Sequence, residues 1–358
     1  MFLSPKIFTF CSKMNHYIQK IINFGPFKHT HHPMQINLID ISEDEIFERM
    51  PEVLNTLLRD HTLSGTKPDT FRHIKWGTRD YEALGKGFQE NDPIEIQSIT
   101  GKYGKVIQPH ICKTKEVKRT RIKAKAEVFT PSWICNAQNN LVDRAWFDGK
   151  DMFNTENPDH TWTVTQSPIP FTKPNHRWRD YVNAPRMEVA CGEAPYITSR
   201  YDTTTGEFIP TLQRIGFLDR KLRVVTENCR TTKEWIYYAK AALHSCYGFE
   251  WQGDNLLLAR EAVLYTTIEW FLSAFDRMPM KQTINHWAYI ISWNLWQMDG
   301  TTLCVPGTQT YCLIRDWKRW ANRFHKDRKE DYGYRCETFY EQVYHKKPQV
   351  NPQTEIVW

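Results

Sequence analysis

The chain has 358 residues and a formal net charge of +6, from 47 lysines and arginines against 41 aspartates and glutamates. A charged fraction of 25% is ordinary for a globular protein, and the length predicts about two domains. No run of about 18 uncharged apolar residues is present, which excludes a transmembrane helix. The 14 Trp, 16 Tyr and 19 Phe exclude a largely disordered chain, because they bring too much apolar surface.

The nine cysteines are scattered and form no C-x-x-C pair, which predicts reduced thiols and a cytoplasmic location. Residues 1–33 lack the continuous apolar stretch of a signal peptide, so we expect a poorly ordered leader. Three histidines in this leader, His29, His31 and His32, have no cysteine or acidic residue at a useful spacing. We therefore predict no metal site there.

Residues 34–124 are typical of a small α+β domain. A helix is predicted from Ser42 to Leu58, with Ser42 as its N-cap and Glu45 completing a capping box. A short strand is predicted over residues 94–99.

This domain ends in the basic run 113–125, which holds seven basic residues and one acidic residue. Fixed positive charge of this density favours contact with DNA phosphates, and a solvated helix face is the alternative. The expected DNA-binding residues are Lys118, Arg119, Arg121 and Lys123. An acidic nuclease site built from Asp69 or Asp92 with Glu116 is a weaker alternative, because these residues are common and their spacing is arbitrary.

Residues 125–314 alternate short apolar runs with helical patterns, which predicts an α/β domain. We predict helices over 231–245 and 254–275, with Asp254 as the N-cap of the second. Strands are predicted over 186–190, 246–250 and 289–293. The remaining residues, 315–358, form a basic tail, in which Trp317, Trp320 and Phe324 fall on one helical stripe. This stripe either packs on the domain or contacts nucleic acid or a partner subunit.

Three short segments contain residues that suit nucleotide chemistry. Cys191–Ala194 is a small-residue loop after a predicted strand, where backbone can approach a ligand closely. Glu250 ends another strand and can accept hydrogen bonds from ribose hydroxyls. Asp299 precedes Gly300 and can accept a hydrogen bond from an exocyclic amine. Taken alone, each has an ordinary alternative, namely a structural turn or a solvated charge.

Taken in order, the motifs resemble those of the N6-adenine DNA methyltransferases, the modification subunits of restriction systems. Residues 127–131 match the family's E-V-F-T-P, and residues 190–192 match the centre of D-P-A-C-G-S-G. Residues 247–250 match Y-G-x-E, and residues 294–300 resemble the strand that ends in the adenine-facing Asp. The helix that follows Y-G-x-E matches the family's D-N-x-x-x-A-R at Asp254, Asn255, Ala259 and Arg260.

The resemblance implies a Rossmann-like core that binds S-adenosyl-L-methionine, with double-stranded DNA as the partner. In that reading Glu250 holds the ribose and Asp299 faces the adenine. The implied cofactor-binding residues are Phe129, Thr130, Pro131, Glu188, Ala190, Cys191, Gly192, Glu193, Ala194, Glu250 and Asp299. Val189 and Ala194 depart from the family's Pro and final Gly. The 58 positions from Gly192 to Glu250 predict an insertion that includes residues 216–220 and the helix from Thr231.

The family's catalytic D/N/S-P-P-Y/F/W motif is missing, because the chain contains no Pro-Pro. Ser167–Phe171, S-P-I-P-F, precedes the cofactor motif, and residues 351–353 lack the aromatic, so no catalytic residue is assigned. The chain is then the cofactor-binding half of a split enzyme, a truncated or degenerate member, or a fold retained for binding only. We expect an S-adenosylmethionine-binding unit of a DNA adenine-N6 methyltransferase in a restriction–modification or phage-borne system. The alternative is an inactive DNA- or subunit-binding protein with a vestigial fold.

Overall fold

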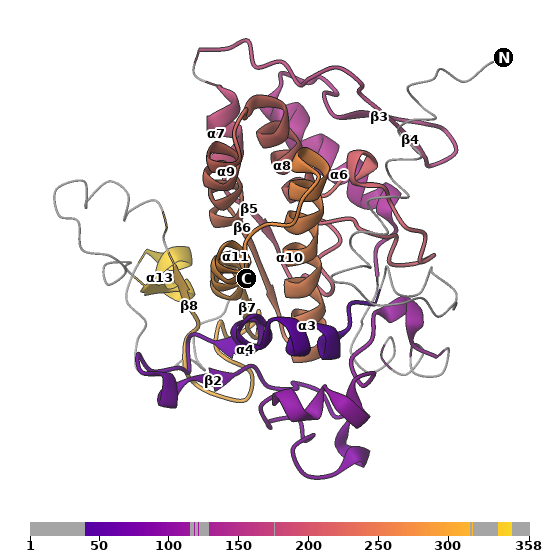
Figure 1. Cartoon of the computed structure of the whole chain (residues 1–358). Coiled ribbons are helices and arrows are strands. Elements are labelled where there is room, and N and C mark those ends of the chain that lie inside the picture. The colour runs from indigo at the N-terminus through magenta and orange to yellow at the C-terminus, as the bar shows by residue number, and fades with distance from the viewer. Residues whose placement is uncertain are drawn as a thin grey trace.

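The computed structural model describes residues 40–114, 118, 121, 129–174, 176–315, 317 and 336–345, which form a mixed α/β fold. At its centre lies a parallel sheet of three strands in the order β5-β6-β7 (Figure 1). The strands are β5 (Arg186–Glu188), β6 (Cys246–Glu250) and β7 (Leu295–Gln297). Met187 pairs with Tyr247, and Phe249 pairs with Trp296. The predicted strand over 246–250 is confirmed, and the one from Arg186 ends two residues earlier than expected.

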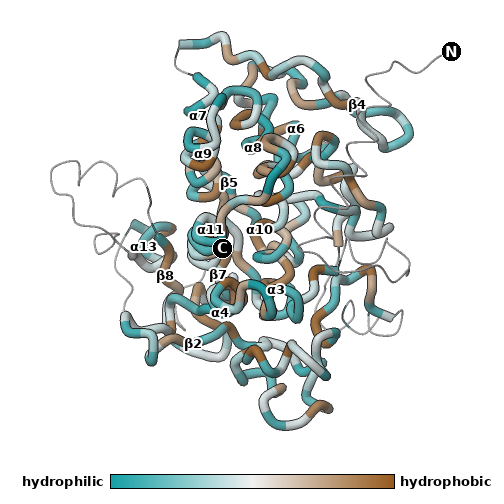
Figure 2. Tube along the Cα trace, in the orientation of Figure 1, coloured by the Kyte–Doolittle hydropathy of each residue, from teal (hydrophilic) through white to brown (hydrophobic). Residues whose placement is uncertain are grey.

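Two helices connect each pair of neighbouring strands in the central sheet. Between β5 and β6 lie α8 (Phe217–Asn228) and α9 (Thr232–His244), so the long step from Gly192 to Glu250 holds both helices. The predicted helix over 231–245 is confirmed as α9, and the Thr231 side chain caps it by accepting from the Glu234 N–H. Along α9 hydrophobic and hydrophilic residues alternate (Figure 2), as expected for a helix with one face on the core.

The second connection begins with α10 (Gly253–Phe275), whose residues are buried over most of its length. The helix ends where predicted, but Asp254 is not its N-cap, because the helix begins one residue earlier, after Gln252. The Asp254 carboxylate instead accepts a hydrogen bond from the Tyr81 hydroxyl at 2.8 Å, within the fold. Among the residues described, no helix combines the length and apolar composition that crossing a membrane requires.

The predicted strand over 289–293 is wrong, because these residues belong to α11 (Lys281–Asn294). Ile284, Trp287 and Ile291 recur at helical spacing and are buried. A short apolar run of this kind has the same appearance in a buried helix as in a buried strand. The strand that the sheet uses, β7, starts only after this helix ends.

The N-terminal part packs α4 (Pro51–Leu58) against α11, below the sheet in Figure 1. Ser42 is the N-cap predicted, and its hydroxyl accepts from the Glu45 N–H at 3.3 Å. The single helix expected to reach Leu58 is divided, because Pro51 starts a new helix after α3 (Glu43–Arg49). The strand predicted over 94–99 is also wrong, since residues 96–98 form the short 3-10 helix η3 (Ile96–Ser98).

The remaining elements are short and surround this centre. The strand pairs are antiparallel: β1 (Arg59–Asp60) with β2 (Arg72–His73), β3 (Asn154–Glu156) with β4 (Trp162–Val164), and β8 (Leu313–Arg315) with β9 (Cys336–Thr338). The other α-helices are α6 (Ser132–Trp146), α7 (Trp178–Asn183) and α13 (Phe339–Tyr344). The other 3-10 helices are η1 (Pro68–Thr70), η2 (Glu82–Leu84), η4 (Gly101–Tyr103), η5 (His110–Cys112) and η6 (Thr211–Gln213).

One hydrophobic core joins the N-terminal part to the central sheet. Its buried members run from Ile41 to Ile107 and continue from Phe153 to Trp317. Residues on both sides of the expected domain boundary at 124 therefore share a core. A second cluster, which contains Phe249, covers the other face of the sheet together with β8 and α13.

An unpaired buried acid lies where α10 faces the N-terminal part. Both carboxylate oxygens of Glu261 are buried and have no hydrogen-bond partner among the residues described. Burial, followed by the negative charges of Glu43 and Asp40, holds the pKa of Glu261 well above its usual value. Burial also raises the pKa of Asp40 to about 6. The folded protein therefore takes up protons at these carboxyls at a higher pH than the unfolded chain does.

We expect Glu261→Gln to make stability less dependent on pH. A raised folded pKa contributes stability below the unfolded value of about 4.5, and this contribution is lost as the pH rises. The loss reaches about 1.4 kcal/mol per pH unit for one proton. Urea unfolding from pH 4.5 to 8 should therefore show a shallower decline for Glu261→Gln than for the natural chain. The exposed control Glu207→Gln should follow the natural chain, and parallel curves for Glu261→Gln and the natural chain would contradict this account.

Candidate functional site

Three of the predicted site residues meet at the carboxyl edge of the parallel sheet. The Gly192 N–H donates to a Glu250 carboxylate oxygen at 2.9 Å, which joins the loop after β5 to the end of β6. A Cβ atom placed on Gly192 would meet Phe129 at 3.7 Å. Phe129, Gly192 and Glu250 are far apart in sequence, yet they form one cluster where parallel α/β sheets bind ligands.

The loop 190–194 has an unusual backbone. Ala190, Gly192 and Ala194 all have positive φ, at 50°, 53° and 61°. For the two alanines this conformation costs about 1–3 kcal/mol each, and such strain concentrates at functional sites. Ala194, which stands where the motif that this loop resembles has its final glycine, adopts the left-handed conformation that a glycine favours. Its N–H donates to the Cys191 carbonyl at 2.7 Å, which closes a tight turn.

Glycine at position 248 lets this loop lie close to β6. A Cβ on Gly248 would lie 3.2 Å from the Ile197 side chain and 3.3 Å from the Cys191 Sγ. The Cys191 N–H also donates to the Phe249 carbonyl at 2.8 Å. The glycine of Y-G-x-E thus has a packing role, since it admits the loop that follows β5.

Glu250 is a buried acid that is already partly hydrogen-bonded. Its carboxylate accepts from the Gly192 N–H at 2.9 Å and from the Gln252 N–H at 3.1 Å. Burial raises the pKa of Glu250, and backbone N–H donors at Gln252, Gly192 and Trp251 oppose the rise. A carboxylate offers about four acceptor positions, so these donors do not use all of them.

Asp299 follows β7 at the same edge. The preceding residue, Met298, donates its N–H to the Glu250 carbonyl at 3.0 Å, so the ends of β6 and β7 are adjacent. The Asp299 carboxylate accepts from the Thr301 N–H at 2.8 Å and from the Thr302 hydroxyl at 2.8 Å. Burial would raise the pKa of Asp299, but the hydrogen bonds from Thr301 and Thr302 lower it below the usual value.

The other acids expected at this site have internal partners. Glu188 accepts from the Ile197 N–H at 3.0 Å, and burial holds its pKa well above the usual value. Glu193 accepts from the Tyr201 hydroxyl at 2.6 Å and from the His110 N–H at 2.5 Å. These hydrogen bonds give Glu188 and Glu193 a structural role, because they hold the loop 190–194 against its neighbours.

The E-V-F-T-P segment is described only from Phe129 onward. Pro131 is the N-cap residue of α6, and the Thr130 carbonyl accepts from the Thr203 hydroxyl at 3.1 Å. Phe129 stacks on His110, with ring centroids 4.1 Å apart. Sequence reasoning missed His110, because no motif marks it and its contact forms only through the fold.

The basic run does not behave as one exposed face. Arg121, expected to bind DNA, has a 1% exposed side chain and forms ion pairs with Asp254 at 3.0 Å and Asp80 at 2.7 Å. Its charge is neutralised inside the protein, so the expected DNA contact at Arg121 is corrected to a structural role. Lys118 donates to the Ile111 carbonyl at 3.1 Å. Arg119 and Lys123 lie outside the described residues.

Only part of the proline-containing segments and of the tail lies within the described residues. The S-P-I-P-F segment packs on α8, where the Ile169 N–H donates to Glu227 at 2.8 Å. Trp317 of the tail is buried and donates to Asn294 at 2.7 Å, as the packing interpretation of its stripe expects. Trp320, Phe324, residues 351–353 and the histidines of the leader lie outside the described residues. Among the described residues, no group of three or more His, Cys, Asp or Glu is arranged to hold a metal.

Comparisons with protein families, with curated proteins and with solved structures find no match to this chain. The interpretation of the site therefore depends on its own geometry and on the motifs that this geometry brings together.

Proposed function

We propose that the carboxyl edge of the β5-β6-β7 sheet binds S-adenosylmethionine, and that the chain is the cofactor-binding unit of a DNA adenine-N6 methyltransferase. The sheet would then be part of a Rossmann-like core. The observation that carries the proposal is the convergence of the motifs: the loop at Gly192, the acid at Glu250 and the ring of Phe129 form one cluster. This cluster lies at the carboxyl edge of a parallel sheet, where α/β folds bind ligands, and that position supports the proposal.

The residues at this edge fit the proposed cofactor. A Cβ on Gly192 would meet only Phe129 within 4 Å, apart from the chain neighbours and among the described residues, so the backbone here is accessible to a ligand. Glu250 retains acceptor capacity for a ribose hydroxyl, because the backbone N–H groups of Gly192, Trp251 and Gln252 do not use all of its about four acceptor positions. We propose that Phe129 and Pro131 wall the cofactor and that Asp299 lies near its adenine. When bound, S-adenosylmethionine supplies a methyl group activated by its sulfonium.

The proposal is tested by titrating S-adenosylmethionine into the full chain in a calorimeter. Glu250→Gln keeps the shape of the side chain and removes its charge, so we expect binding at least about tenfold weaker, since hydrogen bonds to charged groups are the stronger ones. The control Glu207→Gln, at an exposed residue outside the motifs, should bind like the natural chain. Thermal unfolding of each variant distinguishes a loss of binding from a loss of the folded structure.

A natural chain that gives no heat of binding at millimolar S-adenosylmethionine would rule the cofactor out. Equal affinity of Glu250→Gln and the natural chain would rule out the role of Glu250. If the cofactor binds, transfer of radiolabelled methyl groups to DNA distinguishes a complete enzyme from a half. We expect no transfer by the chain alone, because its sequence lacks a Pro-Pro motif, and transfer after a partner that carries N-P-P-Y is added.

A further inference from the structure

The two outer strands of the central sheet differ in how they are covered. All three residues of β7 are buried, and the carbonyls of Leu295 and Gln297 accept from Arg260 at 2.6 Å and from the Cys312 thiol at 3.2 Å. The outer side of β7 is therefore occupied within the chain. On the outer side of β5 no other strand of the described residues is paired. An open strand of this kind presents free backbone donors and acceptors to another strand.

The outward backbone groups of β5 belong to Met187. The preceding residue, Arg186, donates its N–H to the Ser245 carbonyl at 2.8 Å and so faces β6. Backbone groups alternate between the two sides of a paired strand, which directs the N–H and C=O of Met187 outward. Among the described residues, no hydrogen bond outside the β5-β6 ladder reaches the backbone of Met187 or Val189. We call these outward groups of Met187 and Val189 the open side of β5.

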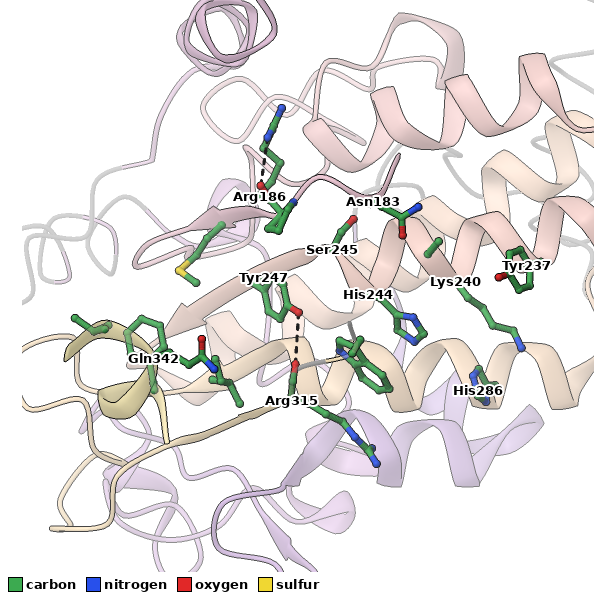
Figure 3. Close-up of a pocket in the computed structure, with 17 residues that line it drawn as sticks. Asn183, Arg186, Tyr237, Lys240, His244, Ser245, Tyr247, His286, Arg315 and Gln342 are labelled. Carbon is green, nitrogen blue, oxygen red and sulfur yellow. Dashed lines mark hydrogen bonds between the residues drawn. The ribbon is translucent and has the colours of Figure 1, made fainter. Parts of the chain in front are cut away.

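The side chains along the open side of β5 are apolar and exposed. Met187 is 41% exposed, and Val189 is 67% exposed. Met187 also lines a cavity of about 890 Å³, together with Tyr247 and Phe339 (Figure 3). This cavity leaves room beside Met187 for a side chain from an added strand. Because the strands of parallel sheets are normally buried, exposed apolar residues at this position favour a partner that covers them.

The segment Arg186-Met187-Glu188 is complementary to itself when two copies run antiparallel. If Met187 lies opposite Met187 of the second copy, the two residues exchange N–H···O=C hydrogen bonds. Arg186 then lies opposite Glu188 of the second copy, and Glu188 lies opposite its Arg186. Both lie on the sheet face opposite to Met187, and Figure 3 shows Arg186 directed away from Tyr247, the residue that pairs with Met187.

The charges select this register over its neighbour. Arg186 donates only to its neighbouring Pro185 carbonyl, and Glu188 accepts from the Ile197 N–H, so neither has an ion-pair partner in the described part of the chain. The register that places Met187 opposite Val189 would bring the two Glu188 carboxyls together. Like charges directly opposite each other are destabilising, whereas opposite charges stabilise a strand pair.

From these features we propose that the open side of β5 is an interface between two copies of this chain. The two β5 strands pair antiparallel about a twofold axis at Met187, which joins the two sheets and covers Met187 and Val189. The dimer is weak, with a dissociation constant in the micromolar range, because so short a strand pair buries little surface. The proposal does not depend on the function proposed above, because it does not use the cluster of Phe129, Gly192 and Glu250.

The test is analytical ultracentrifugation of the full chain from about 1 to about 200 µM, where we expect an equilibrium between monomer and dimer. Met187→Lys and Met187→Glu should each weaken the dimer at least about tenfold, because like charges then meet at the twofold axis. An equimolar mixture of these two variants should associate again, because opposite charges then meet. Recovery of this kind requires that residue 187 of one copy face residue 187 of the other.

The matched control is Met280→Lys, at a methionine that is 67% exposed and lies outside β5, and this variant should dimerise like the natural chain. The Met187 amide should also exchange with solvent more slowly at high protein concentration than at low concentration. A natural chain that stays monomeric throughout would overturn the proposal and leave the open side of β5 to a strand of another protein. A mixture of Met187→Lys and Met187→Glu that does not associate would also overturn it. Unfolding midpoints confirm that each variant is folded.

Discussion

Replacing Arg260 by alanine is expected to lower the free energy of unfolding by about 3–5 kcal/mol. The Arg260 guanidinium is fully buried and donates to the backbone carbonyls of Leu57, Arg59, Ser292 and Leu295. It therefore ties the ends of α4 and α11 and the start of β7 to the middle of α10. Burial lowers its pKa to about 10, so it stays charged at neutral pH. Alanine would leave these buried carbonyls without a donor.

Urea unfolding of Arg260→Ala and Arg260→Lys measures this effect. Lysine keeps the charge but cannot form the same fork of hydrogen bonds, so we expect an intermediate loss. Arg277→Ala is the control, because Arg277 is exposed just beyond the end of α10 and donates only to the Thr232 hydroxyl among the partners described. That variant should lose less than about 1 kcal/mol. A loss of stability in Arg260→Ala no larger than in Arg277→Ala would contradict the proposed role of the Arg260 hydrogen bonds.

Glu269→Ala is expected to cost a similar amount, about 3–5 kcal/mol. Glu269 is buried on α10 between two buried arginines, with oxygens 2.8 Å from Arg200 and 2.5 Å from Arg214. Burial opposes ionisation of this acid, but the charges of Arg200 and Arg214 lower the pKa of Glu269 below its usual value. Removing the carboxylate would leave the buried Arg200 and Arg214 without the ion-pair partner that they share.

The pH dependence gives this second variant a distinctive test. A lowered folded pKa contributes stability above the unfolded value of about 4.5, and the contribution is lost as the pH falls. The difference between the natural chain and Glu269→Ala should therefore be largest near pH 7 and shrink below pH 4.5. Asp151→Ala removes the half-exposed pair with Arg144 and should cost less than about 1 kcal/mol. A difference that grows in acid would show that Glu269 does not act through its charge.

Helices with strong local signals were predictable from the sequence. The α9 helix has a threonine N-cap and a clear amphipathic pattern, and its predicted bounds agree with the structure within one residue. The prediction failed where an apolar run was buried on all sides, as at residues 289–293 within α11. In such a run local pattern does not separate helix from strand, and packing decides. Pro51 was visible in the sequence, but its effect as the start of a second helix was not recognised.

Part of the candidate site was also predictable. The sequence marked Gly192 and Glu250 separately, and the pairing of β5 with β6 brings them into direct contact. The sequence could not show that Arg121 lies inside the protein, because a basic run has the same composition whether its charges face solvent or an acid such as Asp254.

The shared core has a consequence for how this protein can be divided or recombined. The contacts of Ile41 to Ile107 belong to the same packed interior as α10 and α11, and the Gly253 N–H donates to the Trp76 carbonyl at the start of α10. A fragment cut at residue 125 would expose that interior to water and aggregate. A chimeric protein would therefore keep the fold only if residues 41–107 were transferred together with the motif-bearing segment.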